Sequence, residues 1–468
     1  MQKSGASIDV SRRAFIGGTA AFAGLPLLGA TPQNGEADTT CPPNAAWETV
    51  FGDATPAVLV RRLYLDLAGR IPTVEEAKAF VSSRNRKGLV DKLLASDSFA
   101  DYWSMRFCDI LRVKSEFPIN LWPNAVYVYH RRIREFVKKD EPWTAFTRAL
   151  LSATGSDFRD AEANFFRASA LRTPEGLAEA ATATFLGENY ADLPEKTRAE
   201  YAKYFRRVRI KNTREWKEEI VFAEGEDTRG ELCDEVFGRC RAEVESAFRG
   251  LVRGWIFGPG PRPSAKGGRF GLKDVLRELV LSDEYARGSV TGGFPARRID
   301  AEVLDDVICT LSDSKRDYQS PAPEPFTFLP KDRHTVCIED GSISSSFLTL
   351  FGRPARDTGL QSERSSDVTP KQRLYLFNSG RLHGMLGRVA MPGGWKDNPL
   401  AKLPMRQRVD DLYWRVLSRA PSDDERSRVI DLWKSRGGGK KGSKARSGDL
   451  LRDVAWCLFN TKEFLFRI

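Results

Sequence analysis

Residues 61–113 read RRLYLDLAGRIPTVEEAKAFVSSRNRKGLVDKLLASDSFADYWSMRFCDILRV, and this stretch decides the fold. Gly69 accepts the left-handed conformation that ends many helices, and Pro72 prevents the first helix from continuing. Thr73 opens a T-x-x-E capping box, which starts a second helix. Ser96 can cap a third helix, in which aromatic residues recur at helical spacing. The stretch therefore predicts three short helices along an aromatic seam.

The same corner recurs near the C-terminus. The segment DLYWRVLSRAPSDDE (residues 411–425) repeats RLYLDLAGRIPTVEE (residues 62–76) at one constant offset. The cap sequences LLASDSFA, LVLSDEYA and CLFNTKEF begin at Leu93, Leu279 and Cys457. Any corner of helix, proline, cap and helix shares part of this pattern, but two copies with both flanking helices favour a genuine repeat. We predict a mostly α, multi-helical fold with repeated helix-Pro-cap-helix corners and little strand.

Long motifs in both halves are similar to one family, the planctomycete cytochrome-associated group built from paired domains of unknown function, 1549 and 1553. The N-terminal half matches through RRLYLDLAGRIPT, LVDKLLASDSFADYW, LRVKSEFPINLWPNAV, LLSATGSDF, ANFFRA and TPEGLAEAATATFLG. The C-terminal half matches through PARRIDAEVLDDV, FLTLFGRPARDT, ERSSDVTPKQRLYLFNSG and LYWRVLSRAPSDDE. The resemblance covers most of residues 53–468 and implies a paired-domain architecture, but it implies no settled biochemical activity.

One departure from the family concerns haem. Many relatives follow the tripeptide FLG with Cys-x-x-Cys-His, where two cysteines and a histidine attach a c-type haem. Here Phe185-Leu186-Gly187 continues as ENYADL (residues 188–193), which holds neither residue type. The family's haem therefore cannot be transferred to this chain. We predict a branch that lacks the haem motif and binds no cofactor.

The N-terminus carries an export signal. Ser11, Arg12, Arg13 and Phe15 belong to a twin-arginine motif, and the apolar, Gly/Ala-rich run that follows is too short for a comfortable membrane span. A chance arginine pair before an ordinary helix is the less favoured alternative. We predict a signal peptide over residues 1–30 and a periplasmic or extracellular protein, exported by the twin-arginine route without a transmembrane anchor in the mature chain.

The predicted domain organisation follows from breaks in the helical pattern. An N-terminal helical domain spans residues 41–257, a Gly/Pro linker spans 258–271, and a C-terminal helical domain spans 272–468, with irregular residues 312–346 and flexible residues 436–448. Residues 198–254 are expected to be helical, with Trp216 and Phe222 as buried anchors. Strand is expected only in short pieces around Pro325 to Phe347, including Val336-Cys337-Ile338.

Composition restricts the class of partner. The chain has 468 residues and a formal net charge of +10. Such a balance would suggest nucleic acid for a cytosolic protein, but export makes that partner implausible. We expect an envelope or secreted protein partner or an acidic polysaccharide, with a merely solvated basic surface as the bland alternative. The seven cysteines are an odd number, and Cys233 and Cys240 stand too far apart on one helix for a direct disulfide.

No catalytic motif stands out in the sequence. The three histidines, at positions 130, 334 and 383, show no metal-ligand spacing, so no metal site is predicted. There is no G-x-S-x-G elbow and no P-loop. The best candidate binding residues are Arg353, Glu363, Arg364 and Ser365, polar groups in a loop before a helix start, and a second polar-aromatic site holds Asn164 and Arg167. Such residues can meet an anion, but a structural Arg–Glu network is the favoured interpretation.

Three functional classes remain. We favour an exported, non-catalytic protein that binds or assembles with other factors of the cell envelope, because catalytic and haem motifs are missing. The first alternative is a glycan-acting hydrolase with an Asp/Glu/Arg cleft, since a carboxylate pair is defined only by separation in space. The second is a haem-less accessory of an electron-transfer or degradative complex. A deep acidic pocket would favour the hydrolase.

Overall fold

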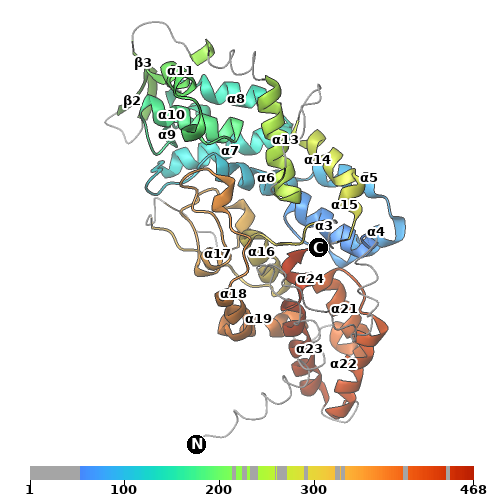
Figure 1. The fold of residues 1–468 in the computed structure, drawn as a ribbon. Helices are drawn as coiled ribbons and strands as arrows, with labels where there is room; N and C mark the ends of the chain where they lie inside the picture. The colour runs from blue at the N-terminus through green and yellow to red at the C-terminus, as the bar shows by residue number, and fades with distance from the viewer. Residues whose placement is uncertain are drawn as a thin grey trace, which may run out of the picture.

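The computed structural model describes residues 53–468 apart from 213–217, 224–228, 232–240, 259, 261–270, 289–293, 322–326, 328–331, 394–398 and 439–442. The described residues do not include the signal motif, Trp216, Cys41, Cys233 or Cys240. They also leave out most of the predicted linker and residues 439–442 of the predicted flexible segment. The described chain is mostly helical with little strand, which confirms the predicted fold class. Figure 1 shows an elongated arrangement, with α9–α11 at one end and α22 and α23 at the other.

The helices of the N-terminal part are α3 (Pro56–Ala68), α4 (Val74–Ser83), α5 (Arg86–Leu94), α6 (Asp97–Ile110), α7 (Pro123–Lys139), α8 (Trp143–Leu151), α9 (Asn164–Arg167), α10 (Pro174–Ala181), α11 (Glu195–Phe205) and α13 (Arg241–Phe257). Those of the C-terminal part are α14 (Leu272–Leu281), α15 (Asp283–Ala286), α16 (Ala301–Leu311), α17 (Ser346–Leu350), α18 (Pro370–Asn378), α19 (Gly380–Ala390), α20 (Pro399–Lys402), α21 (Met405–Leu417), α22 (Asp423–Ser435), α23 (Ser443–Phe459) and α24 (Lys462–Leu465). Short 3-10 or π turns are η2 (Ala161–Ala163), η3 (Thr182–Leu186), η4 (Tyr190–Asp192), η5 (Thr335–Cys337) and η6 (Gln361–Glu363).

The predicted repeated corner forms twice, with the same contacts in each copy. In the first copy the Thr73 side chain accepts from the Glu76 amide, and Arg70 donates to both Glu76 carboxylate oxygens at 2.8 and 2.9 Å. The second copy repeats this arrangement, because Arg419 donates to both oxygens of Glu425 at 2.7 and 2.9 Å. The capping boxes at Thr73 and Ser422 are complete, and such a cap contributes about 1 kcal/mol to helix stability.

The first corner depends on glycine for two reasons. Gly69 has φ of 59°, in the left-handed region that glycine occupies at little cost. A Cβ at this position would lie 2.5 Å from the ring of Tyr102 on α6. The corner therefore requires both the backbone freedom and the small size of glycine, as the sequence predicted for the helix end.

The recurring cap sequences also share one geometry. The hydroxyls of Ser96, Ser282 and Thr461 each accept from the amide three residues later, at 3.2, 3.3 and 3.2 Å. Each also donates at 2.7 Å to the carbonyl three residues earlier. In each turn one hydroxyl bonds a free carbonyl at the end of one helix and a free amide at the start of the next. The three similar sequences therefore form three equivalent turns.

An aromatic core joins α6, α8 and α13. Trp103 and Phe107 of α6 lie with ring centroids 5.5 and 5.3 Å from Trp255 of α13. Phe107 also contacts Trp143 of α8 at 5.6 Å, and Trp143 stacks on Phe248 at 5.0 Å. All five side chains are buried. Because such pairs add about 0.5–1.5 kcal/mol each beyond area burial, this seam is a major source of stability.

The strands do not lie where the sequence placed them. A three-stranded antiparallel sheet has the order β1 (Gly155–Ser156), β3 (Glu218–Phe222), β2 (Val208–Asn212), and β4 (Arg297–Arg298) pairs with β5 (Phe466–Arg467). The expected helix over residues 198–254 is therefore wrong at 208–212 and 218–222, where β-branched residues favour strand and Phe222 belongs to β3. The expected strand at Val336 is wrong as well, because Thr335–Cys337 is a 3-10 turn.

The first described helix packs against the end of the chain. Arg61 donates at 2.9 Å to the carbonyl of Val416, at the end of α21. Asp66 of α3 forms a buried ion pair with Arg467 of β5 and accepts at 2.8 Å from the hydroxyl of Tyr285. In Figure 1 the blue helices α3 and α4 accordingly lie beside the red helices α21 and α24. Contacts of this kind tie the N-terminal and C-terminal parts together. No helix among the described residues is long and apolar enough to cross a membrane.

Candidate functional site

The loop that the sequence singled out, residues 353–367, links two buried carboxylates. Arg364 donates to Asp109 Oδ2 through Nε at 3.1 Å and Nη2 at 2.7 Å. The same guanidinium donates to Glu302 through Nη1 at 2.7 Å and Nη2 at 2.9 Å. Asp109 lies on α6 of the N-terminal part, whereas Glu302 lies in the first turn of α16. The Arg364 side chain is 8% exposed, so it is a buried link between the two parts of the chain.

Two further arginines of this loop complete the network. Arg356 is fully buried; its Nε donates to Asp109 Oδ1 at 2.9 Å, and its Nη1 donates to two backbone carbonyls. Arg353 places Nε 3.4 Å from Glu302 Oε1 and donates to the carbonyl of Ile343. Each carboxylate therefore faces two guanidinium groups. Pairs of this kind, between buried arginines and buried carboxylates, are strongly destabilising to break, as expected for a structural network.

The arginines hold the buried carboxylates in their charged form. Burial alone raises the pKa of Glu302, but Arg364 and Arg353 outweigh burial and lower this pKa to about 2. Asp300, the N-cap residue of α16, behaves similarly, because Arg106 and Arg364 overcome the effect of burial and hold its pKa below the usual range. Both groups are therefore ionised at neutral pH, and neither can serve as a general acid.

The other two candidates in this loop lie outside the network. Glu363 accepts at 2.6 Å from the Thr358 amide and does not pair with its neighbour Arg364. The Ser365 carbonyl accepts from Arg298 at 2.7 Å, while its hydroxyl bonds Asp367 at 3.1 Å. The structure therefore brings Arg353 and Arg364 together but assigns Glu363 and Ser365 to local turns.

The second candidate pair is buried elsewhere, in α9. Asn164 is fully buried, and its amide donates to the carbonyls of Asp157 at 2.7 Å and Ala161 at 3.1 Å. Arg167 is also buried, forms an ion pair with Glu218 of β3 and donates to backbone carbonyls of the loop before α7. These contacts fasten the three-stranded sheet to α9, and they leave neither side chain facing solvent.

Sequence reasoning missed most of the network. Asp109, Asp300, Glu302 and Arg356 were not singled out, because each looks locally like an ordinary helix or loop residue. One signal was present: Arg106 and Asp109 interrupt the aromatic seam of α6, and a charged residue on an apolar face needs a buried partner. The spacing could not identify the partners, because Asp300 lies 194 positions from Arg106 and Arg356 lies 247 positions from Asp109.

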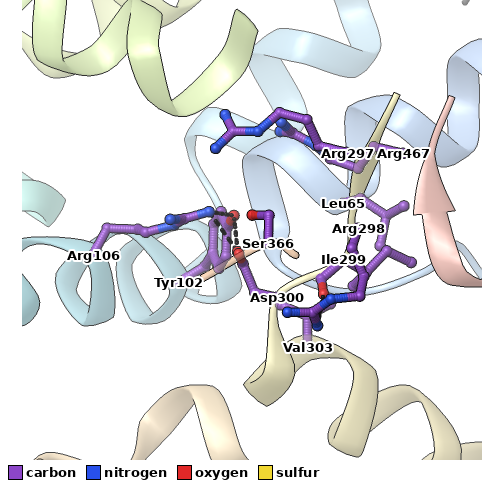
Figure 2. A pocket seen from close by; sticks show the side chains of 10 residues that line it. All are labelled: Leu65, Tyr102, Arg106, Arg297, Arg298, Ile299, Asp300, Val303, Ser366 and Arg467. Carbon is purple, nitrogen blue, oxygen red and sulfur yellow. Dashed lines mark hydrogen bonds and ion pairs between the residues drawn. The ribbon is translucent and has the colours of Figure 1, made fainter. Parts of the chain in front are cut away.

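A small cavity adjoins the network where β4, α6 and β5 meet. It is lined by Leu65, Tyr102, Arg106, Arg297, Arg298, Ile299, Asp300, Val303, Ser366 and Arg467. Figure 2 shows these side chains, with Arg106 bonded to Asp300 and to the Tyr102 hydroxyl. The space is small and its lining is basic, whereas a glycan hydrolase would need a deep acidic cleft.

The second feature suited to binding is the outer face of α18. Among the described residues, Leu374 is 59% exposed, Phe377 43%, and Val368, just before the helix, 39%. Leu374 and Phe377 are three residues apart and share one face of the helix. The opposite face packs inward, where Gln372 donates to the Leu350 carbonyl at 2.9 Å. A capping box between Thr369 and Gln372 fixes the start of this helix.

The segment that follows Gly187 contains no haem ligands. Gly187 ends the preceding turn in the left-handed conformation, and Asn189 caps the 3-10 turn η4. Residues 188–193 include neither cysteine nor histidine. The absence of a covalently bound haem stays a prediction.

The fold and these contacts define a mostly α protein whose two parts are fastened by buried arginine–carboxylate pairs. Residues 48–217 match the family described as PSCyt2, protein of unknown function (DUF1549), and residues 267–433 match PSD1, protein of unknown function (DUF1553). The chain belongs to the family in which these two domains are paired, as its motifs predicted. No curated protein and no solved structure matches it. The network at Arg364 joins residues from both matched regions.

Proposed function

We propose that this protein is exported by the twin-arginine route and binds or assembles with another protein of the cell envelope through the outer face of α18. The observation that carries the proposal is the exposed apolar pair Leu374 and Phe377 on that face. Exposed apolar side chains that cluster on one helix face are typical of interaction sites. A binding role explains why Leu374 is apolar on this face, while the Phe377 ring also contacts Trp456 of α23, with ring centroids 5.5 Å apart.

The charges beside this face suggest the chemistry of the partner. Lys371 and Arg373 are exposed on α18, and the helix carries no acidic residue. A partner surface with an apolar contact and an acidic rim would complement it, because opposite charges steer association and fix orientation. An acidic polysaccharide would meet the basic residues but would leave Leu374 and Phe377 without an apolar contact. We therefore place a protein partner first.

The chemistry of the buried groups supports a non-catalytic role. Burial raises the pKa of the Cys108 and Cys309 thiols to about 12, so both are protonated and poorly nucleophilic at neutral pH. Burial, with smaller contributions from nearby arginines, lowers the pKa of His130 to about 3 and keeps it neutral. The carboxylates between the two parts are paired with arginines. None of these groups is poised for acid–base or nucleophilic chemistry.

The test introduces a charge on the proposed face. Leu374→Glu is expected to reduce recovery of the envelope partner by about tenfold or more, because the glutamate would be repelled by the acidic rim and would lose the apolar contact. Its effect on the free energy of unfolding should stay within about 0.5 kcal/mol, as for most surface changes. The measurement is quantitative recovery of partner with the exported protein, alongside a thermal melt.

Leu171→Glu is the matched control, because Leu171 is also 59% exposed but precedes α10. It should leave partner recovery unchanged. Equal recovery with the two variants and the wild type would refute the assignment of α18.

A further inference from the structure

The cavity beside the arginine network has an unbalanced charge. Its lining contributes four arginines, Arg106, Arg297, Arg298 and Arg467, but only one carboxylate, Asp300. Arg106 is paired with Asp300, and Arg467 is paired with Asp66. Among the described residues, Arg297 and Arg298 form no ion pair and donate only to backbone carbonyls. Two guanidinium charges thus adjoin the cavity without a carboxylate partner, although buried charges are normally paired.

Unpartnered donors accompany this excess charge. The Nε atoms of Arg106 and Arg298 are buried and have no hydrogen-bond partner in the described structure. Both residues line the cavity and are only 6% and 5% exposed. In Figure 2 the Ser366 hydroxyl points toward the guanidinium end of Arg106. The Arg297 side chain extends above these two side chains from β4. Arginine only donates hydrogen bonds, so a ligand that only accepts would suit these groups.

The pKa shifts of Arg297 and Arg298, which line the cavity, agree with this geometry. Burial, followed by the charges of Arg467 and Arg106, lowers the pKa of Arg297 to about 10. Burial also lowers the pKa of Arg298. Both shifts reflect a charged form that lacks sufficient counter-charge, and a negative charge in the cavity would oppose them.

The cavity size restricts the ligand. It leaves about 10 Å³ for the centre of a water-sized sphere, about the room that one water molecule needs. We propose that the cavity binds one small monovalent anion, namely a chloride ion, which is slightly larger than a water molecule. A phosphate or a sulfate would require the arginines to move apart. The bound ion would offset one of the two unpaired guanidinium charges at the junction of β4, α6 and β5, and would thereby stabilise the contact between the two parts of the chain.

The test is a thermal melt of the full-length exported protein in sodium chloride or sodium gluconate at equal ionic strength, about 0.15 M. Ligand binding to the folded state raises stability. We expect the melting temperature to be higher in chloride by about 2 °C or more, with a saturable concentration dependence. Bromide should act like chloride, and a bromide-soaked crystal should show anomalous scattering beside Arg297. Equal melting temperatures in chloride and gluconate would overturn the proposal, as would stabilisation by phosphate alone.

Arg297→Gln should remove the chloride dependence, whatever its effect on stability in gluconate. Arg253→Gln is the matched control, because Arg253 lies on α13, pairs with Glu284 at 2.8 Å and does not line the cavity. It should keep the full chloride response. A chloride response that survives in Arg297→Gln would show that the ion binds elsewhere. If Arg297→Gln does not fold, the proposal is tested by the wild-type melting temperatures in chloride and gluconate together with the anomalous signal of bromide.

Discussion

Arg364→Ala is expected to lower the free energy of unfolding by about 3 kcal/mol or more. Arg364 donates four hydrogen bonds, to Asp109 and Glu302, and its side chain is 8% exposed. Alanine would leave two buried carboxylates without enough positive charge beside them. The free-energy cost of such unpaired buried charges is much larger than the stabilisation that an exposed ion pair provides. A thermal or denaturant melt of the variant beside the wild type measures the loss.

Arg428→Ala provides the matched control for this substitution. Arg428 pairs with Asp424 at 3.0 Å on α22, and the two side chains are 51% and 61% exposed. Such an exposed pair is worth about 0.3–0.5 kcal/mol, so the control should barely shift the melt. If Arg364→Ala shifted the melt no more than the control, the structural interpretation would fail. The loop 353–367 would then become the first place to look for a ligand.

Replacing both Arg12 and Arg13 with lysine is expected to leave the protein in the cytoplasm. The twin-arginine signal is read by a receptor, so lysine does not substitute although it keeps the charge. The measurement is the distribution of the protein between cytoplasmic and exported fractions. We expect a loss of essentially all export, the largest effect on localisation that a conservative double substitution can have.

The same double substitution at Arg206 and Arg207, an adjacent pair outside the leader, is the control and should be exported normally. Normal export of the Arg12/Arg13 variant would remove the twin-arginine interpretation. It would also remove the reason for placing the binding partner in the envelope, so this experiment bears on the proposed function as well.

The repeated corners could be predicted because their determinants are local. A left-handed helix end, a proline and a capping box lie within about ten residues, and each acts through the backbone next to it. The structure therefore reproduces both corners and all three hydroxyl caps. The many charges around Val208 and Ile220 suggest a solvated helix, but these two residues lie in β2 and β3. Pairing of β3 with two other strands decides the conformation there, and such pairing depends on tertiary context.

The junction between the two parts could not be predicted from the sequence. The sequence points to the loop around Arg364 only through its polar residues before a helix start. Its partners, Asp109 and Glu302, stand 255 and 62 positions away. No periodicity or motif connects such distant residues, and only the fold shows that they meet. The basic cavity could not be predicted for the same reason, because Arg106, Arg298 and Arg467 come from segments that are far apart in the sequence.

We propose above that the outer face of α18 contacts a partner in the envelope. The most direct measurement places a photo-crosslinking amino acid at Leu374 of the exported protein in living cells, with the same residue at Leu171 as control. We predict one discrete crosslinked species from position 374 and none from position 171. Absence of a crosslink at position 374, with normal export of the protein, would contradict the proposed contact at α18, and so would the same species at both positions.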